Sequence, residues 1–190
     1  MKALITGASS GMGADMARCL VNEGYEVILV ARRKGRLEKL AKELGNKATF
    51  IVKDISSTFN CMELYNEVKK ENIDIFINNA GFGVFGEFYK TSLDKELDMI
   101  DLNVKSLHTL TKLFLKDFIK KDRGYILNVA SSAGFMAGPL MASYYATKNY
   151  VVSLTSAIYE ELKKMGSNVS ISAFCPGPVD TEFNLSLIHI

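Results

Sequence analysis

The sequence has no tryptophan, and only three prolines, three cysteines and two histidines among its 190 residues. The cysteines, Cys19, Cys61 and Cys175, are odd in number, widely separated and without a C-x-x-C pair, which argues against a disulfide framework and a zinc site. The histidines, His108 and His189, are too few and too far apart to suggest a metal centre. We therefore expect reduced thiols, no bound metal and a cytoplasmic location.

Long hydrophobic runs and an excess of one charge are also missing. Uninterrupted apolar runs such as Val27–Ala31 are far shorter than the roughly 20 residues that a membrane helix needs. Gly7 and Gly11 interrupt the apolar stretch near the N-terminus, so we expect no signal peptide. A net charge of +2 gives no electrostatic reason to bind nucleic acid or an anionic membrane.

Short apolar segments alternate with amphipathic segments along what we expect to be one domain, residues 1–190. The apolar segments predict strands at Lys2–Thr6, Glu26–Ala31, Ala48–Val52, Ile73–Asn78, Gly124–Val129 and Val169–Phe174. Periodic apolar positions predict helices from Met12 onward, over Leu37–Leu44, Cys61–Lys70, Leu93–Lys121 (bent near Asn103) and Tyr144–Met165. This alternation indicates β-α-β units and a Rossmann-like α/β fold, a doubly wound parallel sheet in three α/β/α layers.

A glycine-rich turn, Gly7-Ala8-Ser9-Ser10-Gly11-Met12-Gly13, follows the first predicted strand. Between a strand and a helix N-terminus, outward N–H groups and missing Cβ atoms allow a phosphate to approach closely. The spacing is G-x-x-x-G-x-G and differs from the common G-x-G-x-x-G dinucleotide pattern. A tight turn that needs glycine only for packing is the alternative.

The end of the second predicted strand bears on the choice of cofactor. An NAD site would place Asp or Glu there for the adenosine ribose, yet there is no acidic residue between Glu26 and Glu38. Arg32 and Arg33 follow the strand instead, and guanidinium groups suit the 2′-phosphate of NADP. These side chains could merely begin a solvated helix, but the missing acid would still argue against NAD.

Two further loops are expected at the carboxyl edge of the sheet, where doubly wound sheets bind ligands. Lys53-Asp54-Ile55 follows the third strand and Asn78-Asn79-Ala80-Gly81 ends the fourth, although an ordinary turn would explain the second loop equally well. Asn103 interrupts a periodic helix, and periodicity alone favours an exposed side chain there.

Three Tyr-x-x-x-Lys pairs begin at Tyr65, Tyr144 and Tyr159, a spacing that brings both side chains to one helix face. An ammonium group lowers the pKa of a neighbouring phenol, so such a pair suits proton transfer. Only Tyr144 has a serine, Ser131, thirteen residues upstream at the tip of a predicted strand. The adjacent Tyr145 lies about 100° around the helix and should face elsewhere.

In this order and spacing, the motifs resemble those of the short-chain dehydrogenase/reductase family, from Lys2 to about Phe183. The motifs are Thr6-Gly7-x-x-x-Gly11-x-Gly13, Asn79-Ala80-Gly81, Asn103, Ser131, Tyr144-x-x-x-Lys148 and Pro176-Gly177. The resemblance implies that Tyr144 is the general acid/base and that Ser131 hydrogen-bonds the same substrate oxygen. It also implies that Lys148 lowers the tyrosine pKa and holds the nicotinamide ribose, while Asn103 holds a water that links Lys148 to solvent.

The resemblance further implies an NADP-preferring member that binds NADP(H). The residues expected at the cofactor are Gly7, Ser9, Ser10, Gly11, Met12, Gly13, Arg32, Arg33, Asp54, Ile55, Asn79, Ala80, Gly81, Tyr144, Lys148, Pro176, Gly177, Val179 and Thr181. The glycines would cradle the pyrophosphate, the loops after the third and fourth strands would border the adenosine, and the segment from Pro176 would border the nicotinamide.

The C-terminal residues depart from the family pattern. Members continue into a substrate-covering loop, further helices and a last strand, whereas Leu185–Ile190 matches nothing expected there. We therefore expect a truncated chain, atypical over about 184–190 and lacking the last strand and helices. An unpaired sheet edge should make it less stable than a complete homologue, and poorly active.

The expected function is an NADP-dependent oxidoreductase that acts on a ketone, aldehyde or secondary alcohol. Several side chains could form an apolar substrate end or simply pack the loops: Phe82, Val84, Phe85, Phe135, Met136, Leu140, Met141 and Phe183. An NADPH-binding regulator and an inactive fragment are the alternatives, and the Ser131/Tyr144/Lys148 set argues against the regulator. The family's habit of pairing helices suggests a homo-oligomer through Leu107–Phe118 and Val151–Leu162.

Overall fold

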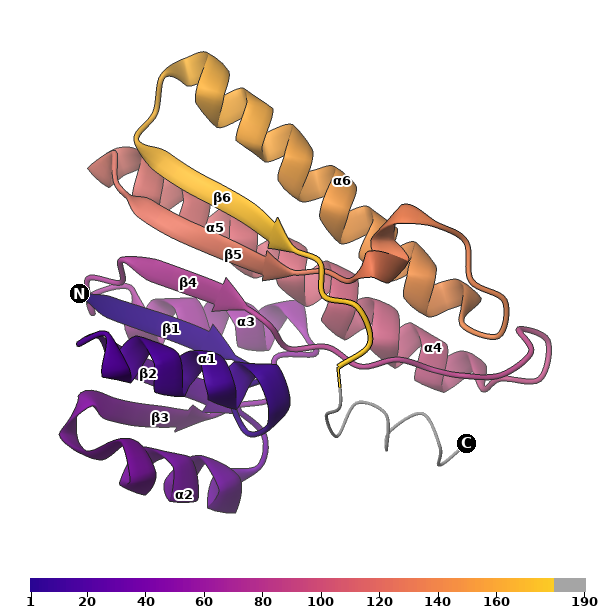
Figure 1. The fold of residues 1–190 in the computed structure, drawn as a ribbon, viewed down its shortest axis with the longest axis horizontal. Helices are drawn as coiled ribbons and strands as arrows, with labels where there is room; N and C mark the ends of the chain where they lie inside the picture. The colour runs from indigo at the N-terminus through magenta and orange to yellow at the C-terminus, as the bar shows by residue number, and fades with distance from the viewer. Residues whose placement is uncertain (180–190) are drawn as a thin grey trace.

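Six parallel strands form one sheet in the computed structural model, which describes residues 1–179 (Figure 1). The strands are β1 (Lys2–Thr6), β2 (Glu26–Ala31), β3 (Ala48–Val52), β4 (Ile75–Asn78), β5 (Gly124–Val129) and β6 (Val169–Phe174). Their order is β3-β2-β1-β4-β5-β6, so the winding direction reverses between β1 and β4. All six arrows point the same way in Figure 1, and the loops that follow them gather at one edge. The predicted doubly wound fold is confirmed.

Helices cover both faces of the sheet. They are α1 (Gly11–Asn22), α2 (Lys34–Leu44), α3 (Thr58–Val68), α4 (Leu93–Ile100), α5 (Leu107–Lys121) and α6 (Ala142–Met165), with 3₁₀ turns at Gly45–Lys47 and Ser132–Phe135. Helices α1 and α2 pack on one face, and α3, α5 and α6 pack on the other. The result is the expected three-layer α/β/α arrangement.

The central strands are buried on both faces, which explains their continuous apolar runs. In β1, the fully buried Leu4 faces α3 and α5, where it joins Phe76 and Phe114 in one cluster. Its neighbour Ile5 is also fully buried and faces α1 and α2, where it joins Leu29. The alternation along each strand thus supplies side chains to two separate apolar layers.

Several element boundaries differ from the predicted ones, among them the starts of three elements. Helix α3 begins three residues early, at Thr58, because the Ser57 hydroxyl accepts a hydrogen bond from the Asn60 N–H at 3.1 Å and caps the helix. Helix α2 begins at Lys34 because the first-turn N–H groups bond to the Arg33 carbonyl. Strand β4 begins two residues late, at Ile75, after Asn72 adopts a positive φ of 50°.

The helix predicted over Leu93–Lys121 contains the expected bend, but the expected exposure of Asn103 is wrong. A π-helical turn, Asp101–Ser106, separates α4 from α5, and Asn103 within it is only 1% exposed. A π-helical turn carries an extra residue, so it rotates the side chains relative to the 3.6-residue period. Periodicity therefore assigns the wrong face to Asn103.

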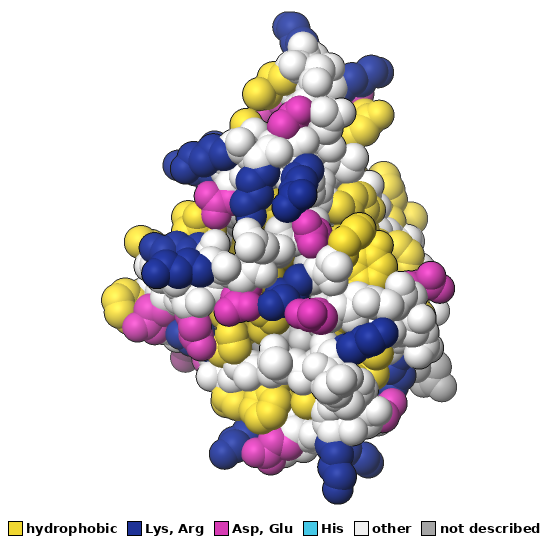
Figure 2. Space-filling model, turned by 90° about the vertical axis from the view of Figure 1, so that its left-hand side faces the viewer, with side chains coloured by type: hydrophobic (Ala, Val, Ile, Leu, Met, Phe, Trp, Pro, Cys, Tyr) yellow, Lys and Arg dark blue, Asp and Glu magenta, His cyan; other side chains and the backbone are white. Residues whose placement is uncertain are grey.

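The face at the amino ends of the strands carries charges of both signs, interspersed as Figure 2 shows. Near this end, the Lys2 ammonium pairs with the carboxylates of Glu26 at 3.3 Å and Glu71 at 2.8 Å. Within residues 1–179, none of the helices combines the length and the apolar character that a membrane span requires. Thr181, Phe183 and the tail expected to be atypical lie outside the described residues.

Candidate active site

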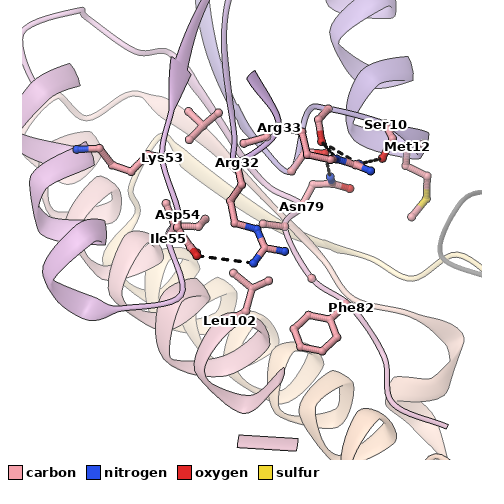
Figure 3. Close-up of a pocket in the computed structure, with 17 residues that line it drawn as sticks. Ser10, Met12, Arg32, Arg33, Lys53, Asp54, Ile55, Asn79, Phe82 and Leu102 are labelled. Carbon is pink, nitrogen blue, oxygen red and sulfur yellow. Dashed lines mark hydrogen bonds and ion pairs between the residues drawn. The ribbon is translucent and has the colours of Figure 1, made fainter. Parts of the chain in front are cut away.

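A cavity of about 350 Å³ opens at the carboxyl edge of the sheet, around the point where the strand order reverses (Figure 3). Most of the predicted cofactor residues line it: Gly7, Ser9, Ser10, Gly11, Met12, Arg32, Arg33, Asp54, Ile55, Asn79, Ala80 and Gly81. Ligands of doubly wound sheets bind at this kind of position. The fold thus brings residues from four loops to one cavity.

The glycine-rich turn uses its glycines for close packing as well as for an open cavity wall. Gly7 has a φ of +66°, and a Cβ added there would lie 2.8 Å from the Ala80 Cα. A Cβ on Gly13 would lie 2.5 Å from both the Asn79 Nδ2 and the Gly7 carbonyl oxygen. Gly13 therefore packs behind the turn and does not line the cavity, and its expected contact with the pyrophosphate stays a prediction.

Thr6, quoted in the motif but not predicted as a site residue, holds the two central loops together. Its hydroxyl accepts hydrogen bonds from the N–H groups of Asn79 at 3.0 Å and Ala80 at 3.1 Å. The Asn79 side chain in turn donates to the carbonyls of Thr6 at 3.1 Å and Gly7 at 3.2 Å. A hydroxyl residue at the last strand position before the glycine turn is the sequence signal for this role.

The two arginines after β2 have different partners. Arg33 donates to the Ser9 hydroxyl from Nε at 3.1 Å and from Nη2 at 3.0 Å, and to the Ser10 hydroxyl from Nη2 at 2.6 Å. Arg32 reaches across the cavity, where its Nη1 lies 3.7 Å from the Asp54 Oδ2 (Figure 3). Arg33 is therefore tied to the glycine-rich turn and is not simply a solvated side chain at the start of α2.

Other cavity-lining residues were not predicted at the cofactor: Val30, Ala31, Lys53, Phe82 and Leu102. Phe82 was assigned to the substrate end, and Figure 3 shows its ring at the rim of this cavity. Leu102 comes from the π-helical turn at the predicted bend. Hydrogen bonds from that turn to Ile55 and Phe82 hold it against the loops after β3 and β4, which brings Leu102 to the cavity.

Ser131, Tyr144 and Lys148 come together beside the cavity wall. Tyr144 lies in the first turn of α6, is 8% exposed, and its side chain is hydrogen-bonded to the Ser131 hydroxyl. The Lys148 ammonium donates to the Val129 carbonyl at 2.9 Å and lies 5.8 Å from the centre of the Tyr144 ring. A phenol, a hydroxyl and an ammonium therefore share one buried site.

The other two Tyr-x-x-x-Lys pairs lack these surroundings. The Tyr65 hydroxyl donates to the Asp117 carboxylate, and burial together with that carboxylate raises its pKa to about 12. Tyr159 is 49% exposed. Tyr145 stands edge-on to Tyr144 and packs beneath Gly138, where an added Cβ would overlap its ring. Of these tyrosines, only Tyr144 has a serine hydroxyl and an ammonium as neighbours.

The pKa shifts of Tyr144 and Lys148 differ from the expected ones. Burial raises the pKa of Tyr144, a change that nearby Tyr145 increases and the hydrogen bond from Ser131 opposes. Burial also lowers the pKa of Lys148 from 10.5 to about 8. The predicted lowering of the Tyr144 pKa by Lys148 is not found, because burial dominates and the ammonium is bonded to the Val129 carbonyl.

The buried Lys148 should make folding stability depend on pH. Between pH 8 and 10.5 the unfolded chain binds a proton at Lys148 that the folded chain does not, so the free energy of unfolding should rise with pH. The shift from 10.5 to about 8 corresponds to about 3 kcal/mol over this window. Urea unfolding of the wild type and of Lys148→Met, compared at each pH, measures this contribution.

The free energy of unfolding must be compared between the wild type and Lys148→Met, because other groups make it fall as the pH rises. Burial raises the pKa values of Cys61, Cys175 and Tyr144, so these groups lower stability as the pH rises through the alkaline range. Cys61 and Tyr144 are common to both proteins and cancel to first order, whereas Cys175 cancels only in part because Lys148 lowers its pKa. If the difference in unfolding free energy between the two proteins stayed constant from pH 7.5 to 10.5, the pKa of Lys148 would not be lowered by folding.

Asn103 lies against the same site and joins two segments. Its Oδ1 accepts from the Phe82 N–H at 3.1 Å, and its Nδ2 donates to the Phe82 carbonyl at 2.8 Å and to the Thr147 hydroxyl at 3.2 Å. A Cβ on Gly81 would lie 2.9 Å from the Asn103 Oδ1 and 3.7 Å from the Lys148 Nζ. Its expected role in holding a water stays a prediction; its side chain has partners of its own.

The segment from Pro176 continues β6 past Ser131 and lies outside the cavity wall. The Ser132 N–H donates to the Pro176 carbonyl at 2.9 Å, and the Ala130 N–H donates to the Phe174 carbonyl at 2.8 Å. Gly177 and the 40% exposed Val179 follow and do not line the cavity. Thr181 is outside the described residues, so its expected role stays a prediction.

The predicted apolar substrate residues divide into two groups. Phe82, Val84 and Met141 pack in one cluster with Tyr144 and the fully buried Met99. The others are exposed: Phe85 is 43%, Phe135 65%, Met136 57% and Leu140 42% exposed. Phe183 lies outside the described residues. The first group shields Tyr144, and the second is exposed to solvent.

Known proteins resemble this chain over nearly its whole length. The sequence profile of the short chain dehydrogenase family matches residues 1–189. An uncharacterized oxidoreductase of Staphylococcus saprophyticus is 33% identical over 189 residues, which cover 96% of this chain and 80% of that protein. Dehydrogenase/reductase SDR family member 11 of Homo sapiens is 32% identical over 196 residues, which cover 97% of this chain and 75% of that protein.

Solved structures agree with the sequence comparison. The closed form of a serine dehydrogenase complexed with NADP⁺ superimposes with a TM-score of 0.92 at 31% identity, and covers 99% of this chain and 77% of that one. The order of the parallel strands agrees with this assignment. The chain therefore belongs to the short-chain dehydrogenase/reductase family of oxidoreductases, which act on CH–OH and C=O groups.

Proposed function

We propose that this protein is an NADP-dependent oxidoreductase that interconverts a carbonyl compound and a secondary alcohol, with Tyr144 as the general acid/base. The observation that carries the proposal is the buried Tyr144 phenol, hydrogen-bonded to Ser131 and close to Lys148, beside the cavity at the carboxyl edge of the sheet. A protein that only binds the dinucleotide needs no proton donor at this position. The arrangement therefore favours turnover over sensing.

The residues have distinct tasks in this proposal. When bound, the nicotinamide supplies or accepts the hydride. Tyr144 donates a proton to the substrate oxygen in reduction and accepts it back in oxidation. Ser131 donates a hydrogen bond to the same oxygen, where negative charge develops. Because burial raises the pKa of Tyr144, the phenol holds its proton at neutral pH, as reduction requires.

The preference for NADP rests on the surroundings of Arg33. Its guanidinium and the hydroxyls of Ser9 and Ser10 form one hydrogen-bonded group at the cavity, beside the end of β2. A planar guanidinium and two hydroxyls suit a phosphate better than a ribose diol. The open cavity, whose wall includes Gly7 and Gly11 at the N-terminus of α1, fits the phosphates of a dinucleotide. Related structures include one complexed with NADP⁺ and one in complex with NAD.

The expected substrate is apolar. Phe82, Val84 and Met141 pack with Tyr144, and the exposed side chains of Phe85 and Leu140 extend this apolar surface outward. Pockets lined by such side chains bind rings and acyl chains and leave sugar hydroxyls without partners.

A cofactor and substrate screen tests the proposal. We expect oxidation of NADPH in preference to NADH, with apolar ketones or aldehydes as substrates and little activity toward sugars. Absorbance at the nicotinamide band measures turnover, and fluorescence of the bound cofactor measures affinity separately. NADPH binding without NADPH oxidation for any compound of the panel would contradict the assignment as an enzyme and support that of an NADPH-binding regulator.

A further inference from the structure

Thr147 lies between Tyr144 and Lys148 in sequence and is 3% exposed. Its hydroxyl donates to the Tyr144 carbonyl at 2.7 Å and accepts a hydrogen bond from the Asn103 Nδ2 at 3.2 Å. The hydroxyl thus serves as donor and acceptor at once. It joins the first turn of α6 to the π-helical turn Asp101–Ser106, more than forty positions earlier in the chain.

The other contacts of Asn103 extend this connection to the cavity wall. The Asn103 side chain bonds to both the N–H and the carbonyl of Phe82, which lines the cavity. Gly81, the preceding residue, lies against both Asn103 and the Lys148 ammonium. A continuous set of hydrogen bonds therefore runs from the loop after β4, through Asn103 and Thr147, to the backbone of Tyr144.

We propose that Thr147 is a positioning residue whose hydroxyl sets the placement of Tyr144 relative to the cavity wall, an inference that rests on the proposed function. A threonine hydroxyl that donates to a carbonyl one turn earlier affects the local helix geometry, and here that carbonyl belongs to Tyr144 itself. Without the hydroxyl, the buried Asn103 amide keeps only its Phe82 carbonyl acceptor. The hydrogen bond that connects α6 to the π-helical turn is then lost.

Thr147→Val keeps the shape of the side chain and removes the hydroxyl. We expect kcat/KM for the carbonyl substrate to fall by roughly 10- to 100-fold, because small misplacements of reacting groups have effects of this size. NADPH affinity should be largely unchanged, since Arg33 and the serines at the adenosine end are untouched. Thr147→Ser retains the hydroxyl and should restore most of the activity.

Thr155→Val is the matched control. Thr155 lies two turns further along α6, is 2% exposed, and its hydroxyl accepts a hydrogen bond from the Asn128 Nδ2 at 3.0 Å. Both substitutions remove one buried hydroxyl from one helix, so both should lower the melting temperature. Only Thr147→Val should change kcat/KM and move the Tyr144 pKa, measured by NMR of ¹³C-labelled tyrosine with Tyr144→Phe for assignment.

Three results would overturn the proposal: equal kinetic loss in Thr147→Val and Thr155→Val, failure of Thr147→Ser to recover activity, or a Tyr144 pKa that Thr147→Val leaves unmoved. The NMR measurement needs no turnover, so it tests the role of Thr147 even if the wild type reduces no compound of the panel. A wild type that reduces no compound of the panel would contradict the proposed function and would leave the role of Thr147 to the NMR measurement.

Discussion

Replacing Tyr144 by phenylalanine should lower turnover by about 10²- to 10⁴-fold, the usual loss for removal of a general acid/base. The phenol is buried against Val84 and Met99, so phenylalanine fills the same space and the fold should be retained. Cofactor affinity should be largely unchanged, because the cavity is lined by other residues. Steady-state NADPH oxidation and NADPH binding by fluorescence measure the two effects separately.

Two other tyrosines provide matched controls for this substitution. Tyr145→Phe removes the neighbouring phenol, and Tyr159→Phe removes an exposed phenol from an equivalent Tyr-x-x-x-Lys pair in the same helix. Both variants should keep most of the wild-type activity. If Tyr145→Phe were the inactive variant and Tyr144→Phe the active one, the assignment of the proton donor would be wrong.

Replacing Arg33 by glutamine should weaken NADPH binding by roughly 10- to 100-fold, which corresponds to the 1.5–3 kcal/mol of a hydrogen bond to a charged group. NADH has no 2′-phosphate, so its affinity should change little. The preference between the two cofactors should therefore shrink or reverse. Titration of each cofactor into wild type and variant gives the four dissociation constants that this comparison needs.

Lys42→Gln is the control for a general electrostatic effect. Lys42 lies in the last turn of α2, is exposed, and does not line the cavity. Its removal changes the net charge by the same amount as Arg33→Gln and should leave both affinities unchanged. If both substitutions weakened NADPH binding equally, long-range electrostatic attraction, rather than a contact with Arg33, would hold the phosphate.

Local composition and the order of elements were enough to predict the layers and the location of the site. Strands buried on both faces must be continuously apolar, so the runs in β1, β2 and β5 identify a parallel sheet. Parallel strands place all their carboxyl ends at one edge, so the glycine turn and Ser131 had to lie at the same edge of the sheet. These features follow from local composition and from the order of elements along the chain.

Long-range contacts in the folded chain determine which side chains are buried and what they bond to. The π-helical turn buries Asn103 against the pattern, and its partners Phe82 and Thr147 lie 21 and 44 positions away. The direction of the Tyr144 pKa shift was also decided there, because desolvation by non-local neighbours outweighs the nearby lysine. Helix spacing describes neighbours on one element, whereas burial and hydrogen-bond partners depend on segments that meet only in the folded chain.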